Sequence, residues 1–174
     1  GVGEKLITSS SSPVFGGVYK LVAVKEDDGT YSPRMKCSDS ASKAIIPGKL
    51  MAWRIYDEEG KGQADIISLD DEIIEEGKEI TVYDMNPDAL HHSRKITPLK
   101  AEKLLVPHLT NGELAMELPT IKEKKEFIKD QLENKVWESE LRPKMPHSHY
   151  VDLTEKVYEV REAMYKKLHG GSLD

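Results

Sequence analysis

The alternation of hydrophobic and polar positions divides the chain into a strand-rich first half and a helix-rich second half. Runs of β-branched and aromatic residues bounded by turn residues predict strands at 18–24, 34–37, 50–56, 64–69 and 80–83. The connections are short, and the turn over 58–62 is typical of a hairpin between antiparallel neighbours. We therefore expect residues 17–86 to form an antiparallel sheet.

Beyond residue 98, apolar positions recur at helical spacing. We expect one helix over 99–109, stopped by Asn111-Gly112, and a second that starts at a capping box over 120–123 and ends at Arg142-Pro143. A last helix should begin at Asp152 and end at Gly170-Gly171. Its apolar stripe is Leu153, Val157, Val160, Met164 and Leu168. The predicted class is α+β, with the helices following the sheet.

Composition narrows the class of protein. The 174 residues are 38% hydrophobic and 32% charged, which fits one domain with a thin core, or a fragment of something larger. A net charge of -6 disfavours a nucleic-acid partner. No apolar run reaches the roughly 20 residues that span a bilayer, and no signal peptide pattern is present, so we expect no membrane partner. The single cysteine, Cys37, excludes an intrachain disulfide and favours a cytoplasmic location.

The opening residues carry the strongest chemical signal. Gly1, Val2 and Gly3 would let the backbone approach an anion closely, and a helix beginning after them would direct free N–H groups at a phosphate, with Lys5 adding charge. The same residues also fit an ordinary tight turn between a strand and a helix, and the carboxylate of Glu4 would repel phosphate. An apolar, glycine-flanked start further suggests that a strand precedes it, so we expect a fragment.

Other candidate sites are weaker. The pairs His91-His92 and His147/His149 lack neighbouring carboxylate or cysteine ligands at metal-binding spacing, so exposed loop histidines are favoured. The acidic run over 70–76 fits a hard cation, but a solvated turn is the commoner explanation. We therefore assign no metal site and no catalytic residue.

Gly1 to Thr8, followed by Pro13 to Val24, strongly resembles nicotinate phosphoribosyltransferases. The resemblance continues in order through 34–38, 47–48, 53–56, 102–107, 111–114, 117–120 and 149–154. Several motifs in one order, covering nearly the whole chain, are far more specific than any one of them.

The resemblance implies a fold and an activity. The fold is that of a type II phosphoribosyltransferase, an α/β barrel with a flanking domain. Residues 1–16 would be the end of the barrel, 17–98 the antiparallel flanking domain and 99–174 the C-terminal helical region. The family makes nicotinate mononucleotide and pyrophosphate from nicotinate and phosphoribosyl pyrophosphate in NAD salvage. ATP hydrolysis and magnesium take part, and the enzyme is commonly a homodimer.

The resemblance also locates the site. The catalytic histidine and the ribose- and magnesium-binding motif would lie upstream of Gly1, so the isolated chain should be inactive. Only the turn of Gly1, Val2 and Gly3 corresponds to a family phosphate-binding position, and Glu4 stands where many members have threonine. Two alternatives remain: a non-catalytic sheet-and-helix module that binds another polypeptide, and a fragment of a nicotinamide-specific relative.

Overall fold

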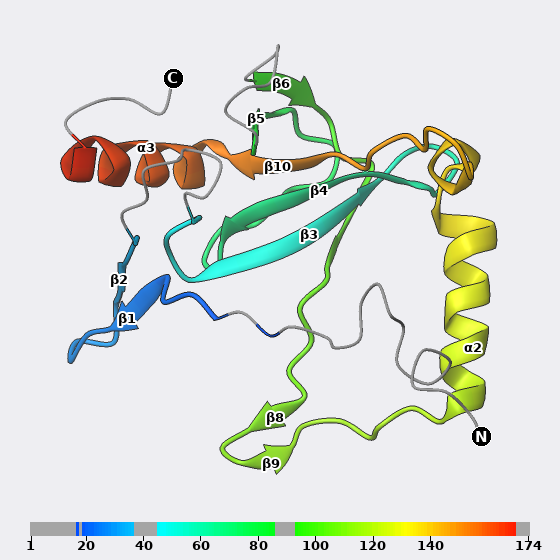
Figure 1. Ribbon diagram of the computed structural model, residues 1–174, viewed down its shortest axis with the longest axis horizontal. Coiled ribbons are helices and arrows are strands. Elements are labelled where there is room, and N and C mark those ends of the chain that lie inside the picture. The colour runs from blue at the N-terminus through cyan, green and yellow to red at the C-terminus, as the bar shows by residue number, and fades with distance from the viewer. Residues whose placement is uncertain (1–16, 18, 37–44, 86–92, 170–174) are drawn as a thin grey trace, which may run out of the picture.

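The computed structural model describes residues 17, 19–36, 45–85 and 93–169. Its body is a six-stranded mixed sheet in the order β6-β5-β10-β4-β3-β7, with helix α3 packed on its central strands (Figure 1). The bounds are β3 Leu50–Tyr56, β4 Gly62–Leu69, β5 Ile80–Asp84, β6 Ser93–Ile96, β7 Lys100–Lys103, β10 Val151–Thr154 and α3 Glu155–His169. The α+β class predicted from the sequence is confirmed.

The β3–β4 hairpin forms as predicted and is the longest pairing in the sheet. Its register runs from Leu50 opposite Leu69 to Tyr56 opposite Gly62, with an irregularity after Ile55. At the tip, Asp57 Oδ1 accepts hydrogen bonds from the backbone N–H groups of Glu59 and Lys61. An aspartate that binds the backbone two residues on is a recurrent turn device, and here it fixes the end of the hairpin.

The core lies on one face of this hairpin and its neighbours. Alternate positions of the strands are buried and form one cluster: Trp53, Ile55, Ala64, Ile66, Val82 and Ile96, joined by Ile74. Burying an isoleucine or valine side chain contributes roughly 1.5–3 kcal/mol. Trp53 Nε1 donates to the buried Ser68 Oγ at 2.9 Å, so the one indole N–H in the cluster is satisfied.

The sheet is not wholly antiparallel, because its central strand comes from the end of the chain. The predicted helix start at Asp152 is wrong: β10 occupies Val151–Thr154 and lies parallel to β4 and antiparallel to β5. The helix begins only at Glu155. Four residues of apolar and polar alternation fit a strand or a first helical turn equally well, and pairing with two central strands decides between them.

The predicted helix over 99–109 is also wrong. Residues 100–103 instead form the edge strand β7 against β3. Beyond it, β8 (Leu109–Thr110) and β9 (Glu113–Leu114) make a small hairpin around Asn111 and Gly112, both with positive φ. Pro107 would interrupt a helix in its interior, and the open edge of β3 offers unpaired backbone groups that a strand satisfies.

Helix α2 (Ile121–Asp130) begins at the predicted capping box. Thr120 Oγ1 accepts from the Glu123 N–H at 3.3 Å, and the Glu123 carboxylate accepts from the Thr120 N–H at 2.7 Å. The helix continues as a π turn, η2 (Gln131–Lys135), and ends earlier than predicted. A separate 3-10 turn, η3 (Glu138–Leu141), follows, and α2 itself projects away from the sheet (Figure 1).

A second, two-stranded sheet precedes the main one. It pairs β1 (Ala23–Lys25) with β2 (Tyr31–Pro33), so the strand expected over 34–37 lies earlier and the one over 18–24 is shorter where described. Residues 17–98 and 99–174 both contribute strands to the main sheet, while the division into three regions stays a prediction. Residues 1–16 and the predicted C-cap Gly170-Gly171 lie outside the described residues.

Candidate functional site

A cluster of charged side chains lies on the sheet face opposite the hydrophobic core. Arg54 of β3 stands opposite Asp65 of β4 in the register, and both residues lie on that face. Arg54 Nε and Nη2 donate to the two carboxylate oxygens of Asp65, each at 2.8 Å. Such a two-bond geometry is the strongest form of an ion pair, and it fixes both side chains.

His149 joins this pair to η3. Its Nδ1 lies 2.9 Å from Glu140 Oε1, and its Nε2 lies 3.3 Å from Asp65 Oδ1. The second contact is an ion pair without hydrogen-bond geometry, since Nε2 is buried and makes no hydrogen bond within the described residues. The Asp65 N–H donates to the Tyr150 carbonyl at 2.9 Å, which holds this stretch of chain against β4.

The cluster shifts the titration of its members. The Asp65 carboxylate, aided by Glu140, raises the pKa of His149 against the opposing effect of burial. Burial alone would raise the pKa of Asp65, but His149 and Arg54 together outweigh it and lower that pKa to about 2. Both shifts favour the charged forms, so the cluster is held as ion pairs.

An open groove runs beside the cluster at the tip of the β3–β4 hairpin. Two hollows of about 520 and 500 Å³ share Asp57, Gln63 and Trp137 in their walls. Further acidic side chains line it, namely Glu58, Glu59 and Glu140.

Arg94 also reaches this groove, but its charge is compensated. It pairs with the buried Asp152 at 2.5 Å and stacks over the Tyr150 ring, 4.2 Å from its centroid. An acidic, aromatic wall with a neutralised arginine suits a cation or an apolar ring better than a phosphate.

The predicted phosphate turn belongs to a part of the chain outside the described residues. Gly1, Val2, Gly3, Glu4 and Lys5 lie outside the described residues, as do Cys37 and His91-His92.

The acidic run over 70–76 has structural contacts. Glu72 Oε2 accepts from the Leu69 N–H at 2.7 Å and from Thr154 Oγ1 at 2.9 Å, so it ties this turn to the start of α3. Asp70 pairs with Lys49 at 2.6 Å. Across the described ranges, no three histidine, cysteine or acidic side chains are grouped as metal ligands.

The expectation that His149 is an exposed loop histidine is wrong, because three-quarters of its side chain is buried. The sequence pattern that could have predicted a buried partner for His149 is the position of Asp65 between two core residues of β4, Ala64 and Ile66. A carboxylate there faces the other side of the sheet, where it requires basic partners.

Helices long and apolar enough to cross a bilayer are absent from the part of the chain that the structure describes.

Comparison with known proteins gives one consistent result. Residues 50–161 match a family model described as the nicotinate phosphoribosyltransferase C-terminal domain. The chain is 31% identical to nicotinate phosphoribosyltransferase of Dictyostelium discoideum, over 91% of the chain and 27% of that protein. It is 30% identical to the Bacillus subtilis enzyme of the same name, over 97% of the chain and 35% of that protein.

The fold agrees with a solved relative. The crystal structure of human nicotinic acid phosphoribosyltransferase superimposes with a TM-score of 0.70 at 26% identity, over 88% of this chain and 28% of that one. The chain therefore spans about a third or less of the length of the relatives that it matches.

Proposed function

Because the chain belongs to the family of nicotinate phosphoribosyltransferase C-terminal domains, we propose that it is the C-terminal part of an enzyme of NAD salvage. That enzyme would make nicotinate mononucleotide and pyrophosphate from nicotinate and phosphoribosyl pyrophosphate, with ATP hydrolysis. The observation that carries the proposal is the match over 50–161, which contains the whole six-stranded sheet and the first half of α3.

The chain's own role would be to support the catalytic part rather than to perform the reaction. Glycosyl transfer from phosphoribosyl pyrophosphate requires positive groups that stabilise the departing pyrophosphate. The groove around Trp137 is acidic, and Arg94 is already paired there. ATP, magnesium and the catalytic residues would thus be held upstream, and the turn at Gly1, Val2, Gly3 and Lys5 would add backbone contacts to a substrate phosphate.

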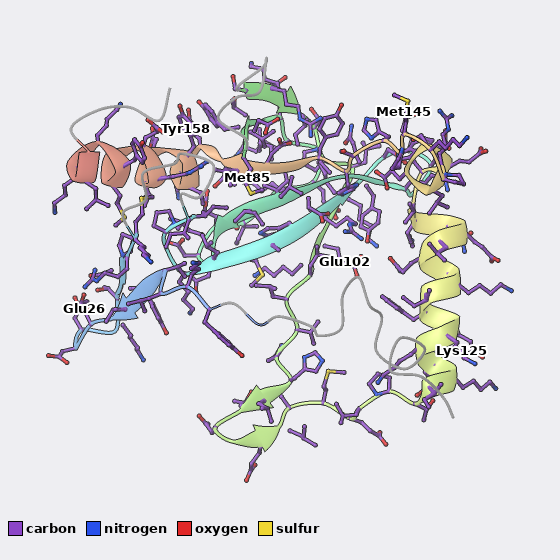
Figure 2. All side chains as sticks on the ribbon, in the orientation of Figure 1. Glu26, Met85, Glu102, Lys125, Met145 and Tyr158 are labelled. Carbon is purple, nitrogen blue, oxygen red and sulfur yellow. The ribbon has the colours of Figure 1, made fainter. Side chains whose placement is uncertain are left out.

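An exposed apolar arm, residues 104–135, supports a role inside a larger assembly. Large hydrophobic side chains lie on its surface: Leu105, Val106, Leu109, Leu114, Leu118, Ile121, Phe127, Ile128 and Leu132. Helix α2 has only ten residues and none of them is buried. Figure 2 shows its side chains, Lys125 among them, extending into the space around the helix. Isolated helices shorter than about 12–15 residues are marginal in water, so α2 needs a covering surface. In this proposal the catalytic part of the enzyme covers it.

The most direct test compares the activity of the two parts of the enzyme, alone and together. The enzyme part that precedes Gly1 and this chain are expressed separately and together, and formation of nicotinate mononucleotide from nicotinate, phosphoribosyl pyrophosphate and ATP is measured. We expect activity only when both parts are present, and none from the chain alone. Activity of the chain alone, or full activity of the preceding part without it, contradicts the proposal. Replacing nicotinate with nicotinamide in the same assay decides between the two substrate branches.

The arm also favours a second candidate function, that of a non-catalytic module whose apolar surface binds another polypeptide. The two candidates differ in one measurement. An interaction module would leave the activity of the preceding part unchanged and would bind a separate protein through the arm.

We place the enzyme in the cytoplasm and expect it to be a homodimer. The single cysteine supports the first assignment, since it gives no disulfide framework. The second rests on the family resemblance, and sedimentation of the full-length enzyme measures it directly.

A further inference from the structure

The connection between α2 and β10, residues 131–150, is held to the β3–β4 hairpin by side-chain contacts at two places and by the backbone hydrogen bond from the Asp65 N–H to the Tyr150 carbonyl. At its start, Lys61 Nζ donates to the Val136 carbonyl at 3.2 Å. Near its end, His149 stands between Glu140 of η3 and Asp65 of β4. Because α2 leads directly into this connection, these contacts hold the C-terminal end of the helix on the sheet.

The geometry around His149 favours an imidazolium. Both ring nitrogens face carboxylate oxygens, at 2.9 Å from Glu140 and 3.3 Å from Asp65. A neutral imidazole carries one N–H, so its other nitrogen would direct a lone pair at a negatively charged oxygen. Only the protonated ring interacts favourably with both groups.

Loss of the proton would affect the two carboxylates differently. Asp65 keeps its two hydrogen bonds from Arg54 in either state. Glu140 interacts with Arg54 only through a longer-range attraction. A neutral ring that keeps its N–H on Nδ1 still donates to Glu140, but it directs the Nε2 lone pair at Asp65. Deprotonation would therefore separate His149 and η3 together from Asp65 and leave the β3–β4 hairpin intact.

We propose that the contact of Glu140, His149 and Asp65 is a proton-controlled clamp that fastens the α2–β10 connection to β4. With the ring protonated, the connection is held against the sheet; with the ring neutral, His149 and η3 separate from Asp65 of β4, while the contact of Lys61 with Val136 remains. The charged groups that face the ring are Asp65 from β4 and Glu140 from η3, with Arg54 of β3 behind Asp65.

Two further observations fit the clamp. Gly62 of β4 packs against the ring without adding charge, since a Cβ there would lie 3.5 Å from His149 Cε1. The raised pKa of His149 keeps the clamp closed to a higher pH than an isolated histidine would allow.

Hydrogen exchange of the 174-residue chain tests the clamp. Exchange of peptides within 131–150 is measured between pH 5.5 and 8.5, corrected for intrinsic rates and compared with that of β3. We expect opening of the connection to increase roughly tenfold or more as His149 loses its proton, since the attraction between the positively charged ring and Asp65 is lost. The midpoint should equal the His149 pKa read from the imidazole proton shift in NMR, and β3 should not change.

Two variants make the result specific. His149→Gln should give high exchange of the connection at every pH, and Glu140→Gln should shrink the pH dependence and lower the midpoint. His147→Gln is the matched control, because that ring lies in the same connection but packs edge-on against Tyr150. It should leave the pH dependence unchanged. If the wild-type connection exchanges independently of pH, or if folded His149→Gln keeps the wild-type profile, the proposal is wrong. Should His149→Gln fail to fold, an unchanged profile in Glu140→Gln overturns it equally.

Discussion

Arg54 and Asp65 face each other across the β3–β4 hairpin and share two hydrogen bonds, each 2.8 Å long. The pair is mostly buried, with 26% and 17% of the two side chains exposed. It anchors His149 as well, and so links the hairpin to the segment that carries α2. The pair thus stabilises the sheet and determines how the arm is attached to it.

Replacing Asp65 by Asn should destabilise the chain by about 1–3 kcal/mol, because it leaves Arg54 and His149 without their shared counterion in a half-buried site. Urea unfolding at neutral pH measures the change. The matched control is Glu79→Gln, which breaks the exposed pair with Lys95 and should have little effect. Equal effects of the two substitutions would show that burial of the Arg54 pair contributes nothing.

The stability of the chain should depend on pH in two opposite ways. The pKa of Asp65 is lowered to about 2, so its contribution is present above the ordinary carboxyl range and is lost as the pH falls toward 2. That contribution is about 2 kcal/mol. The pKa of His149 is raised, so its contribution is complete below the ordinary histidine pKa and is lost as the pH rises through the raised value. Urea midpoints should therefore be highest between about pH 4 and 6.5. In Asp65→Asn the loss of stability at acidic pH should be smaller than in the wild type. A loss of unchanged size would contradict the assignment.

Ile66→Ala should cost about 2–5 kcal/mol, because Ile66 is fully buried in the central strand β4 and its removal leaves a cavity. Ile73→Ala is the control, since 78% of that side chain is exposed. Its effect should stay within about 0.5 kcal/mol. Thermal or urea unfolding of both variants measures the loss of stability. The prediction fails if Ile73→Ala destabilises the chain as much as Ile66→Ala.

Ile128→Ala should leave the isolated chain as stable as before, because Ile128 is exposed on α2. In the complex with the preceding enzyme part it should weaken association by roughly tenfold or more, as expected when an interface loses a buried side chain. Glu126→Ala, on the opposite face of the same helix, should not weaken the association. Titration calorimetry of the separately expressed parts measures both, and equal affinity of the two variants would exclude this face of α2 as the docking surface.

Gly3→Val in the full-length enzyme should reduce affinity for phosphoribosyl pyrophosphate and nicotinate mononucleotide. A β-branched side chain blocks close approach and restricts the backbone of the proposed turn. Each lost hydrogen bond to a charged group should cost roughly ten- to a hundredfold in affinity. A folded variant with normal affinity for both ligands would mean that the turn is only a structural link.

Much of the fold could be predicted from local pattern. The β3–β4 hairpin, β5 and the start of α2 each follow from short-range chemistry: alternating apolar residues, turn residues and the capping box of Thr120 and Glu123. These signals are contained within a few residues, so no distant partner is needed to interpret them. The same holds for the α+β class.

Far less of the candidate site could be predicted from the sequence. Asp65 and His149 are 84 positions apart in the sequence, and neither belongs to a motif that predicts the other as its partner. Their contact depends on the insertion of β10 beside β4, where the Tyr150 carbonyl accepts from the Asp65 N–H. That insertion is a long-range pairing, and the sequence around Val151 to Thr154 fits a helix start as well as a strand.

By itself, the sequence determined the α+β class, the hairpin of β3 and β4, the capped start of α2 and the resemblance to nicotinate phosphoribosyltransferases. Only the tertiary structure decided that residues 151–154 complete the centre of the sheet and that 100–103 extend its edge. It also decided that His149 is an ion-paired, mostly buried group rather than an exposed loop histidine. The physical reason is that backbone hydrogen bonding and the pairing of buried charge are satisfied by partners brought together in space, and such partners leave no pattern at short range along the chain.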